Sequence, residues 1–344
     1  MKRMKITALV LLTLAVILAA CGGNNDSADN NEDSDGETVT LRVAGQNNED
    51  HPNTVALRKM AETVAEKTDG RIEMEIFPAN QLGDYTLMYE EISKGTVDMG
   101  LISTPTQLDS RMEINILPFL FTTYEQAREN FQLDAYYGQK LQELHNEQNI
   151  EAIGFFGEGF GGIGTTKAIT DPLEYGADKG VLLRVPQVNI ITEAAKELGF
   201  NTVSIPYAEL YTALQSGTAE GWTGGHPVVN YLQFRDIITH YYQYNDFFEA
   251  THLLMNKDLF DGFSEEDQKI ILEAGQVLTD ESFDTAEAAE AEYRQKMEDE
   301  GIEVFEFTDE ELEQLAESVR ENVWPHAEDT VGKELLDELV DNIQ

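Results

Sequence analysis

Residues 181–205 of this chain read VLLRVPQVNIITEAAKELGFNTVSI. VLLRV reads as a strand that Pro186 closes, 188–198 has the pattern of a helix, and NTVSI (201–205) reads as a second strand. A helix between two strands favours a parallel sheet, because parallel neighbours need a crossover connection. The stretch therefore predicts an α/β architecture.

The same alternation occurs on both sides of this stretch. Before it, the pattern predicts strands at 38–45, 71–77, 97–102 and 150–156, with helices from Pro52, over 84–95 and within roughly 123–148. After it, the pattern predicts a helix over 207–216, a strand at 218–223, a long helix over about 264–300, a strand at 302–307 and a capping box from Thr308 to Glu311. About 300 folded residues with this order usually form two domains.

Arg184 lies inside the apolar run VLLRV, although cations are scarce in this chain. Lys and Arg number 23 against 65 Asp and Glu, for a formal net charge of -42. A guanidinium in a buried strand needs a partner, because an unpaired buried charge is costly. The partner is either another side chain or a group that arrives from outside.

The N-terminus has the pattern of an export signal. A basic start, an apolar run and small residues precede Cys21, the only cysteine, at a site that resembles a bacterial lipobox. We therefore expect residues 1–20 to be a lipoprotein signal peptide, Cys21 to be lipidated and the polar stretch 21–37 to be a disordered tether. The alternative is a buried core helix. The expected location is the outer face of the cytoplasmic membrane, or the periplasm.

The charge and the remaining motifs exclude several function classes. The strongly acidic composition argues against binding to nucleic acid and to anionic lipid surfaces. The six histidines show no metal-ligand spacing, and no nucleophile motif is present, so the sequence predicts no metal, no cofactor and no catalysis. Among 65 carboxylates, no single pair is informative.

Two glycine-rich stretches are candidates for close contact with a ligand. GFGGIG (159–164) matches a dinucleotide fingerprint, but TTKAITDP follows it instead of a helix, so a flexible crossing between lobes is the better interpretation. Phe160 lies in this stretch. AEGWTGGHPVVNY (219–231) places glycines beside Trp222 and His226, which suits either a ligand site or a turn around a core tryptophan.

Several stretches together resemble the solute-binding proteins of tripartite ATP-independent periplasmic (TRAP) transporters, the DctP family. Their order and spacing match across residues 38–344. The stretches are FPANQLGD (77–84), EEISKGTVDMG (90–100), ILPFLF (116–121), DKGVLLRVP (178–186), ELGFNTVSIPYAELYTALQSGTAEGW (197–222) and LFDGFSEEDQKII (259–271).

This resemblance implies a two-lobe, periplasmic-binding-protein-like (Venus flytrap) α/β fold with crossing strands and a long interlobe helix. On this basis we expect lobe I at 38–157 plus about 250–280, lobe II at 158–249 plus about 300–344, and a connecting helix at about 264–300. The resemblance also implies that Arg184 clamps the carboxylate of the ligand, as the planar guanidinium fork suits. The alternative is a salt bridge to a carboxylate of the protein.

The second contact to the ligand departs from the family pattern. Gly161, Gly162 or Ile163 stands where many relatives have another Arg, and Gly225 and His226 stand near a common Asn. Trp222, His226 or Gln46 could substitute, and Tyr207 could pack on the ligand. The expected ligand-binding residues are Arg184, Trp222, Tyr207, His226, Gln46, Asn47, Glu49, Phe160 and Gly225.

The sequence thus predicts a lipid-anchored protein that binds a small carboxylate and delivers it to a membrane permease with a small and a large TRAP subunit. One clear cation favours a monocarboxylate, such as a hydroxy, keto or sugar acid, and an ectoine-type zwitterion is an alternative. Two other functions stay open: a module that presents its ligand to a membrane kinase, and a nucleotide-linked oxidoreductase that uses GFGGIG.

Overall fold

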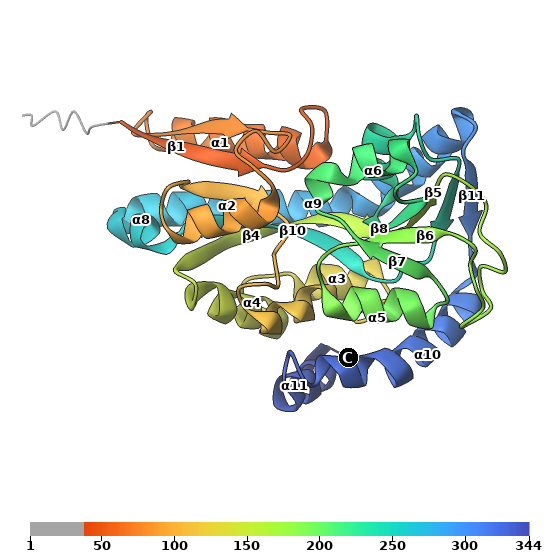
Figure 1. Cartoon of the computed structure of the whole chain (residues 1–344). Helices are drawn as coiled ribbons and strands as arrows, with labels where there is room; N and C mark the ends of the chain where they lie inside the picture. The colour runs from red at the N-terminus through yellow and green to blue at the C-terminus, as the bar shows by residue number, and fades with distance from the viewer. Residues whose placement is uncertain (1–37, 344) are drawn as a thin grey trace, which may run out of the picture. The chain divides into compact units, whose positions relative to one another are not determined.

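A computed structural model describes residues 38–343, and its first sheet has five strands in the order β2-β1-β3-β10-β4 (Figure 1). β1 is parallel to β2 and β3, whereas β10 is antiparallel to β3 and β4. The strands are β1 (Val39–Gly45), β2 (Ile72–Phe77), β3 (Met99–Ile102), β4 (Ile150–Phe160) and β10 (Phe248–Asn256). The N-terminal alternation predicted from the sequence accounts for the parallel half of this sheet.

The second sheet has six strands in the order β11-β9-β5-β8-β6-β7. β6 pairs in parallel with β7 and β8, β5 is antiparallel to β8 and β9, and β11 is parallel to β9. The strands are β5 (Gly162–Thr165), β6 (Leu182–Val185), β7 (Asn201–Ser204), β8 (Gly221–Gly225), β9 (His240–Gln243) and β11 (Glu303–Glu306). The predicted α/β fold class with two lobes is confirmed.

Several helices begin where a polar side chain accepts a hydrogen bond from a free backbone amide. Thr308 and Glu311 form the predicted capping box, and the Ser264 side chain caps the longest helix, α9, which packs along β4. The helices are α1 (Pro52–Lys67), α2 (Tyr85–Ser93), α3 (Tyr124–Asn130), α4 (Tyr136–Asn146), α5 (Asn189–Glu197), α6 (Leu210–Ser216), α7 (Pro227–Val229), α8 (Lys257–Gly262), α9 (Glu265–Asp299), α10 (Asp309–Ala327) and α11 (Lys333–Ile343). Short segments of other helix types are η1 (Ser110–Ile116), η2 (Tyr207–Glu209) and η3 (Asn230–Phe234).

The GFGGIG stretch joins the two sheets. β4 continues to Phe160 in the first sheet, and β5 begins at Gly162 in the second, so only Gly161 lies between them. A helix does not follow these glycines, so the dinucleotide-binding arrangement is not formed by residues 159–164. The return crossing runs from β9 to β10. A predicted lobe boundary at 157/158 therefore falls inside β4.

Three strands were not predicted from the sequence. β5 is rich in glycine, which lowers strand propensity. β9 is short, and its HYYQ sequence has no alternation of apolar and polar residues. β10 is buried on both faces along most of its length, so it lacks the period of two by which a half-buried strand is recognised.

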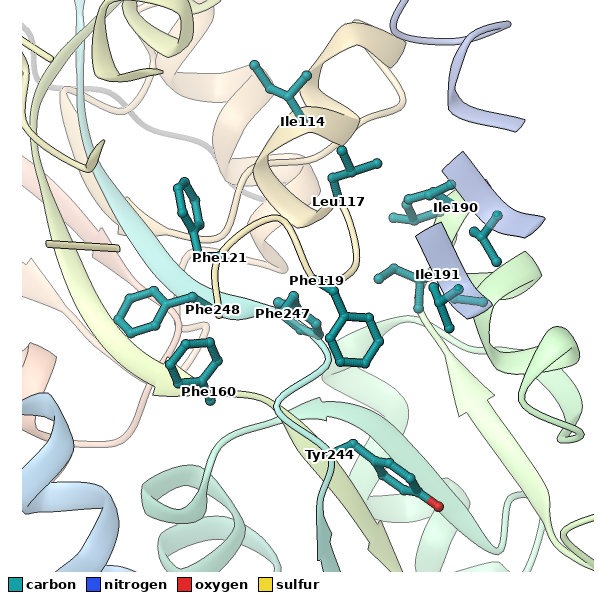
Figure 2. Close-up of a cluster of buried hydrophobic side chains, with 14 of the residues drawn as sticks. Ile114, Leu117, Phe119, Phe121, Phe160, Ile190, Ile191, Tyr244, Phe247 and Phe248 are labelled. Carbon is teal, nitrogen blue, oxygen red and sulfur yellow. The ribbon is translucent and has the colours of Figure 1, made fainter. Parts of the chain in front are cut away.

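The largest apolar cluster contains residues from both predicted lobes. Figure 2 shows Phe119, in the chain after η1, close to Phe247 on one side and to Ile191 on the other. α10 packs against α5, which connects strands of the second sheet. α11 packs against α4, which precedes β4 of the first sheet (Figure 1). α10 and α11 therefore contact helices of different halves of the molecule.

The predicted signal peptide (1–20), tether (21–37) and lipidated Cys21 lie outside the described residues. Within 38–343, no helix is both long enough and apolar enough to cross a membrane.

Candidate functional site

A cavity of about 100 Å³ lies between the two sheets, several times the volume that one water molecule needs. Its walls are formed mainly where strands of the two sheets end, which is the usual ligand position in α/β folds. The first sheet and its connections contribute Gln46, Asn47, Tyr85, Ser103, Thr104, Asn115, Glu158 and Glu249. The second sheet and its connections contribute Arg184, Tyr207, Trp222 and His226.

Arg184 is the cation of this cavity. It is 3% exposed, and its Nε donates a hydrogen bond to the Ile205 carbonyl at 2.8 Å. The two terminal nitrogens have no hydrogen-bond or ion-pair partner within residues 38–343. The guanidinium is therefore held in place by one backbone contact, and its fork is free to bind a group in the cavity.

Burial lowers the pKa of Arg184, while Tyr85 and Tyr207, then Asp84 and Glu249, act in the opposite direction. An arginine nevertheless stays charged in a protein. An uncompensated buried charge is costly, so the site is better satisfied when an anion enters. Within residues 38–343, Arg184 forms no salt bridge with a carboxylate of the protein.

Trp222 and Tyr207 belong to the aromatic part of the wall, with Tyr85 and Phe247. Their ring centroids are 6.3 Å apart. The indole N–H of Trp222 already donates to the Asn230 side chain at 3.1 Å, and the Tyr207 hydroxyl donates to Gln233 at 3.0 Å. Trp222 can therefore offer its ring to a ligand but not its N–H, so it does not replace the missing polar contact of the family.

Gln46 and Asn47 both line the cavity, but they differ in what they can offer. Gln46 is paired twice with Ser103, through its Nε2 at 3.0 Å and its Oε1 at 2.7 Å. Asn47 accepts from Gln233 at 3.1 Å through its Oδ1, whereas its Nδ2 has no partner among the described side chains and carbonyls. Asn47 is thus the better candidate for a second donor to the ligand.

Glu158 and Glu249 are cavity residues that sequence reasoning missed. Burial raises the pKa of Glu158 to about 8, while its hydrogen bonds from Thr251 and Asn53 act in the opposite direction. Burial also raises the pKa of Glu249 well above its usual value, and Glu158 and Asp246 add to that effect. The Glu249 carboxyl group has no hydrogen-bond partner among residues 38–343 and faces the cavity.

His226 lies beside Glu158, with its Nε2 3.5 Å from Glu158 Oε2. A second histidine, His51, approaches the same oxygen at 3.8 Å. Burial lowers the pKa of His226 well below its ordinary value. No sequence motif could have identified this group, because its three members are far apart in the chain.

Three of the expected ligand-binding residues do not line the cavity. Glu49 is exposed and forms an ion pair with Arg58 at 2.6 Å. Phe160 is buried in an apolar cluster, where its ring packs edge-on against Tyr124 and Phe248. Gly225 lies under the indole of Trp222, where a Cβ would overlap the ring. Their positions do not support a direct contact with a ligand in this cavity.

Solved structures share this architecture. The sugar acid binding protein DctPAm from Advenella mimigardefordensis, in complex with galactonate, superposes with a TM-score of 0.81 at 23% identity, covering 90% of this chain and 99% of that chain. A TRAP periplasmic solute binding protein from Desulfovibrio salexigens, with bound orotic acid, has a TM-score of 0.80 at 21% identity, covering 89% and 99%. These likenesses establish the fold.

Sequence comparison agrees with the structural likeness. The 2,3-diketo-L-gulonate-binding periplasmic protein YiaO of Escherichia coli is 24% identical over 247 residues, which are 69% of this chain and 72% of the relative. Residues 43–329 match the model of the bacterial extracellular solute-binding proteins, family 7 (DctP). The predicted resemblance is confirmed: this chain belongs to family 7 of the bacterial extracellular solute-binding proteins, the DctP family.

Proposed function

We propose that this chain captures a small organic acid in the cavity between its sheets, with the ligand carboxylate on Arg184. The observation that carries the proposal is the pair of terminal guanidinium nitrogens that face the cavity without a partner in the described chain. A bidentate contact with a carboxylate would satisfy both nitrogens in one geometry. Asn47 Nδ2 would supply a further hydrogen bond.

Proteins of similar fold support an acidic ligand. Their structures hold galactonate, D-glucuronate, L-gulonate and orotic acid. A hydroxylated or keto acid would also suit this cavity, because Thr104 and Asn115 line it with polar groups. The carboxyl group of Glu249 also lacks a partner in the described chain, and buried polar groups are usually paired. Glu249 therefore favours a ligand that carries a hydroxyl or a cationic group at the end opposite the ligand's own carboxylate.

The proposed role outside the protein is delivery of the bound acid to a membrane permease with a small and a large TRAP subunit. Few polar contacts hold the two halves together around the cavity: Gln233 donates to Asn47 at 3.1 Å, and the Ala208 amide donates to Asp84 at 3.2 Å. Such contacts can break and re-form as a ligand enters and leaves. The lipid anchor at Cys21 would keep the protein beside the permease, and no catalysis is proposed.

A thermal-shift panel tests the carboxylate. Hydroxy, keto, sugar and zwitterionic acids are added to the wild-type protein and to Arg184→Ala. A ligand at about 100 times its dissociation constant stabilises the native state by about 2.7 kcal/mol, so a bound acid raises the melting temperature of the wild type and not of the variant. An acid that stabilises both proteins equally would contradict the role of Arg184.

A further inference from the structure

His51, Glu158 and His226 converge from three separate elements. His51 is the residue before α1, Glu158 lies on β4, and His226 follows β8. All three side chains are buried, and one nitrogen or oxygen atom of each lies within 4.8 Å of the other two. The ring centroids of the histidines are 5.8 Å apart, with the ring planes at 79°.

These three side chains do not satisfy one another. The distances from Glu158 Oε2 to His226 Nε2 and to His51 Nε2 are 3.5 and 3.8 Å, which are too long for good hydrogen bonds. Of the two nitrogens that face Glu158, His51 Nε2 is buried without a hydrogen-bond partner in the described chain. Because buried polar atoms are nearly always paired, this cluster calls for a further partner.

The donor set suits a divalent transition metal. Two imidazoles and one carboxylate, with one position left open, are a known ligand set for Zn²⁺. Metal bonds of about 2.0–2.1 Å in a tetrahedral site place ligand atoms about 3.3 Å apart. The two distances to Oε2 would shorten by a few tenths of an ångström, and the two nitrogens, which lie within 4.8 Å of each other, would also have to approach.

Other residues support the carboxylate in the required orientation. Glu158 Oε1 accepts hydrogen bonds from Asn53 Nδ2 at 2.9 Å and from Thr251 Oγ1 at 3.0 Å. These contacts leave Oε2 directed at the two histidines, as outer partners of metal ligands commonly do. Glu158 and His226 also line the cavity, so an ion between them would have an open position on the cavity side.

One contact would have to change when an ion binds. The backbone N–H of Asn53 donates to His51 Nδ1 at 3.3 Å. Because Nδ1 accepts this hydrogen bond, the ring proton of the neutral imidazole lies on Nε2. Binding of an ion at Nε2 moves that proton to Nδ1 and breaks this long hydrogen bond. The resonance of the Asn53 backbone amide should therefore shift when an ion binds at His51 Nε2. Weak binding at surface carboxylates would not shift it.

We propose that His51, Glu158 and His226 form a three-ligand site for a divalent transition metal ion of the Zn²⁺ class, with its open position facing the cavity. The ion would bind a donor oxygen of the anionic ligand and provide the second positive charge beside Arg184. This role in ligand binding rests on the proposed function, whereas the binding of the ion itself does not.

The test uses the full chain, Zn²⁺ titration by calorimetry and visible absorption with Co²⁺ as the probe, both in excess Mg²⁺ to suppress binding at surface carboxylates. We expect one equivalent of Zn²⁺, bands of four- or five-coordinate Co²⁺, and a shifted Asn53 amide resonance. Glu158→Gln should lower Zn²⁺ affinity more than about 100-fold, beyond the effect of losing an outer partner. His226→Asn serves as the second variant if Glu158→Gln does not fold.

His240→Ala is the matched control, because His240 also lies near a carboxylate, with its Nε2 3.9 Å from Glu303 Oε1, but outside this cluster. It should bind Zn²⁺ as the wild type does. Arg184→Ala should keep the ion and lose the organic acid, which separates the two proposals. Absence of Zn²⁺ binding by the wild type, or unchanged binding by both cluster variants, would overturn the site. An acid that binds equally with and without chelator would overturn the role of the ion in ligand binding.

Discussion

The protein contains two buried histidine clusters that border the same cavity, and only one of them is internally complete. In the first, the Tyr89 hydroxyl, His145, His252 and Asn115 form a chain of hydrogen bonds of 2.9, 2.9 and 2.8 Å. Each ring nitrogen has one partner. In the second, His51, Glu158 and His226 leave two ring nitrogens unpaired within the described chain. The first cluster stabilises the fold, and the second is available to a ligand.

The two most buried long cations differ in the same way. Lys179 is 1% exposed, and its Nζ donates to the carbonyls of Asp171 and Glu174 at 2.7 and 2.6 Å. Arg184 is 3% exposed but is paired only through Nε. Burial alone therefore does not identify a binding residue; burial without a complete set of partners does.

The largest expected loss of stability comes from breaking the complete cluster. His145→Leu leaves the Tyr89 hydroxyl and His252 Nδ1 without partners, so the free energy of unfolding should fall by about 2–5 kcal/mol. His226→Leu, measured in chelator, is the matched variant and should cost at least about 2 kcal/mol less, because its ring has no hydrogen bond to lose. Chemical denaturation measures both free energies of unfolding. Equal losses in the two variants would show that the two histidine clusters do not differ in their hydrogen bonding.

A buried acid should make stability depend on pH. Burial raises the pKa of Asp246 to about 6, while its hydrogen bonds from backbone amides and from Thr223 act in the opposite direction. The native state then holds a proton that the unfolded state releases near pH 4, so this acid's contribution to stability is lost as pH rises from about 4 to about 6.

Asp246→Asn should remove this part of the pH dependence. Above pH 6 the variant should be more stable than the wild type by up to about 3 kcal/mol, and near pH 4 the two should be similar. Melting temperatures across pH 4–8 measure the difference. A constant offset between the two proteins over this whole range would refute the assignment.

Gly225→Ala tests the packing around Trp222. A Cβ at this position overlaps the indole and the Asn230 side chain, so the free energy of unfolding should fall by about 1–3 kcal/mol. Displacement of the indole should also weaken ligand binding. Gly262→Ala is the control, because a Cβ there meets no atom within 4 Å. Unchanged stability and affinity in Gly225→Ala would show that the indole is not held as described.

The smallest expected effect is at Glu49. Its ion pair with Arg58 is exposed, and such pairs contribute about 0–1 kcal/mol. Glu49→Gln should therefore change stability by less than about 0.5 kcal/mol and leave ligand affinity unchanged. A loss of affinity by calorimetry would place Glu49 in the binding site after all.

Much of the fold and part of the site could be predicted from the sequence. Periodicity located the N-terminal strands and the helix pattern around VLLRV, because one face of each helix is apolar. Arg184 was conspicuous because a cation in an apolar strand is rare in so acidic a chain. Gln46, Asn47, Tyr207 and His226 were placed through family motifs and indeed line the cavity.

The rest required the three-dimensional structure. Glu158 and Glu249 are two of 65 acidic residues, and only their position in the wall of the cavity sets them apart. His51 looks like an ordinary residue before a helix. Its approach to Glu158 depends on the end of β4 reaching the start of α1, where Asn53 also contacts Glu158. Glu49 and Phe160 were expected in the cleft from their positions in the chain, but their side chains turn to solvent and to the apolar core.

A calorimetric titration of the strongest-binding acid into the wild type, Arg184→Ala and Arg58→Ala tests directly whether Arg184 holds the carboxylate of the ligand. Loss of one partner from a buried charged contact costs about 2–5 kcal/mol, so Arg184→Ala should bind at least about 30-fold more weakly while it melts cooperatively. Arg58→Ala, with its exposed pair to Glu49, should bind as the wild type does. A folded Arg184→Ala protein with affinity within about twofold of the wild type would show that Arg184 does not hold the carboxylate of the ligand.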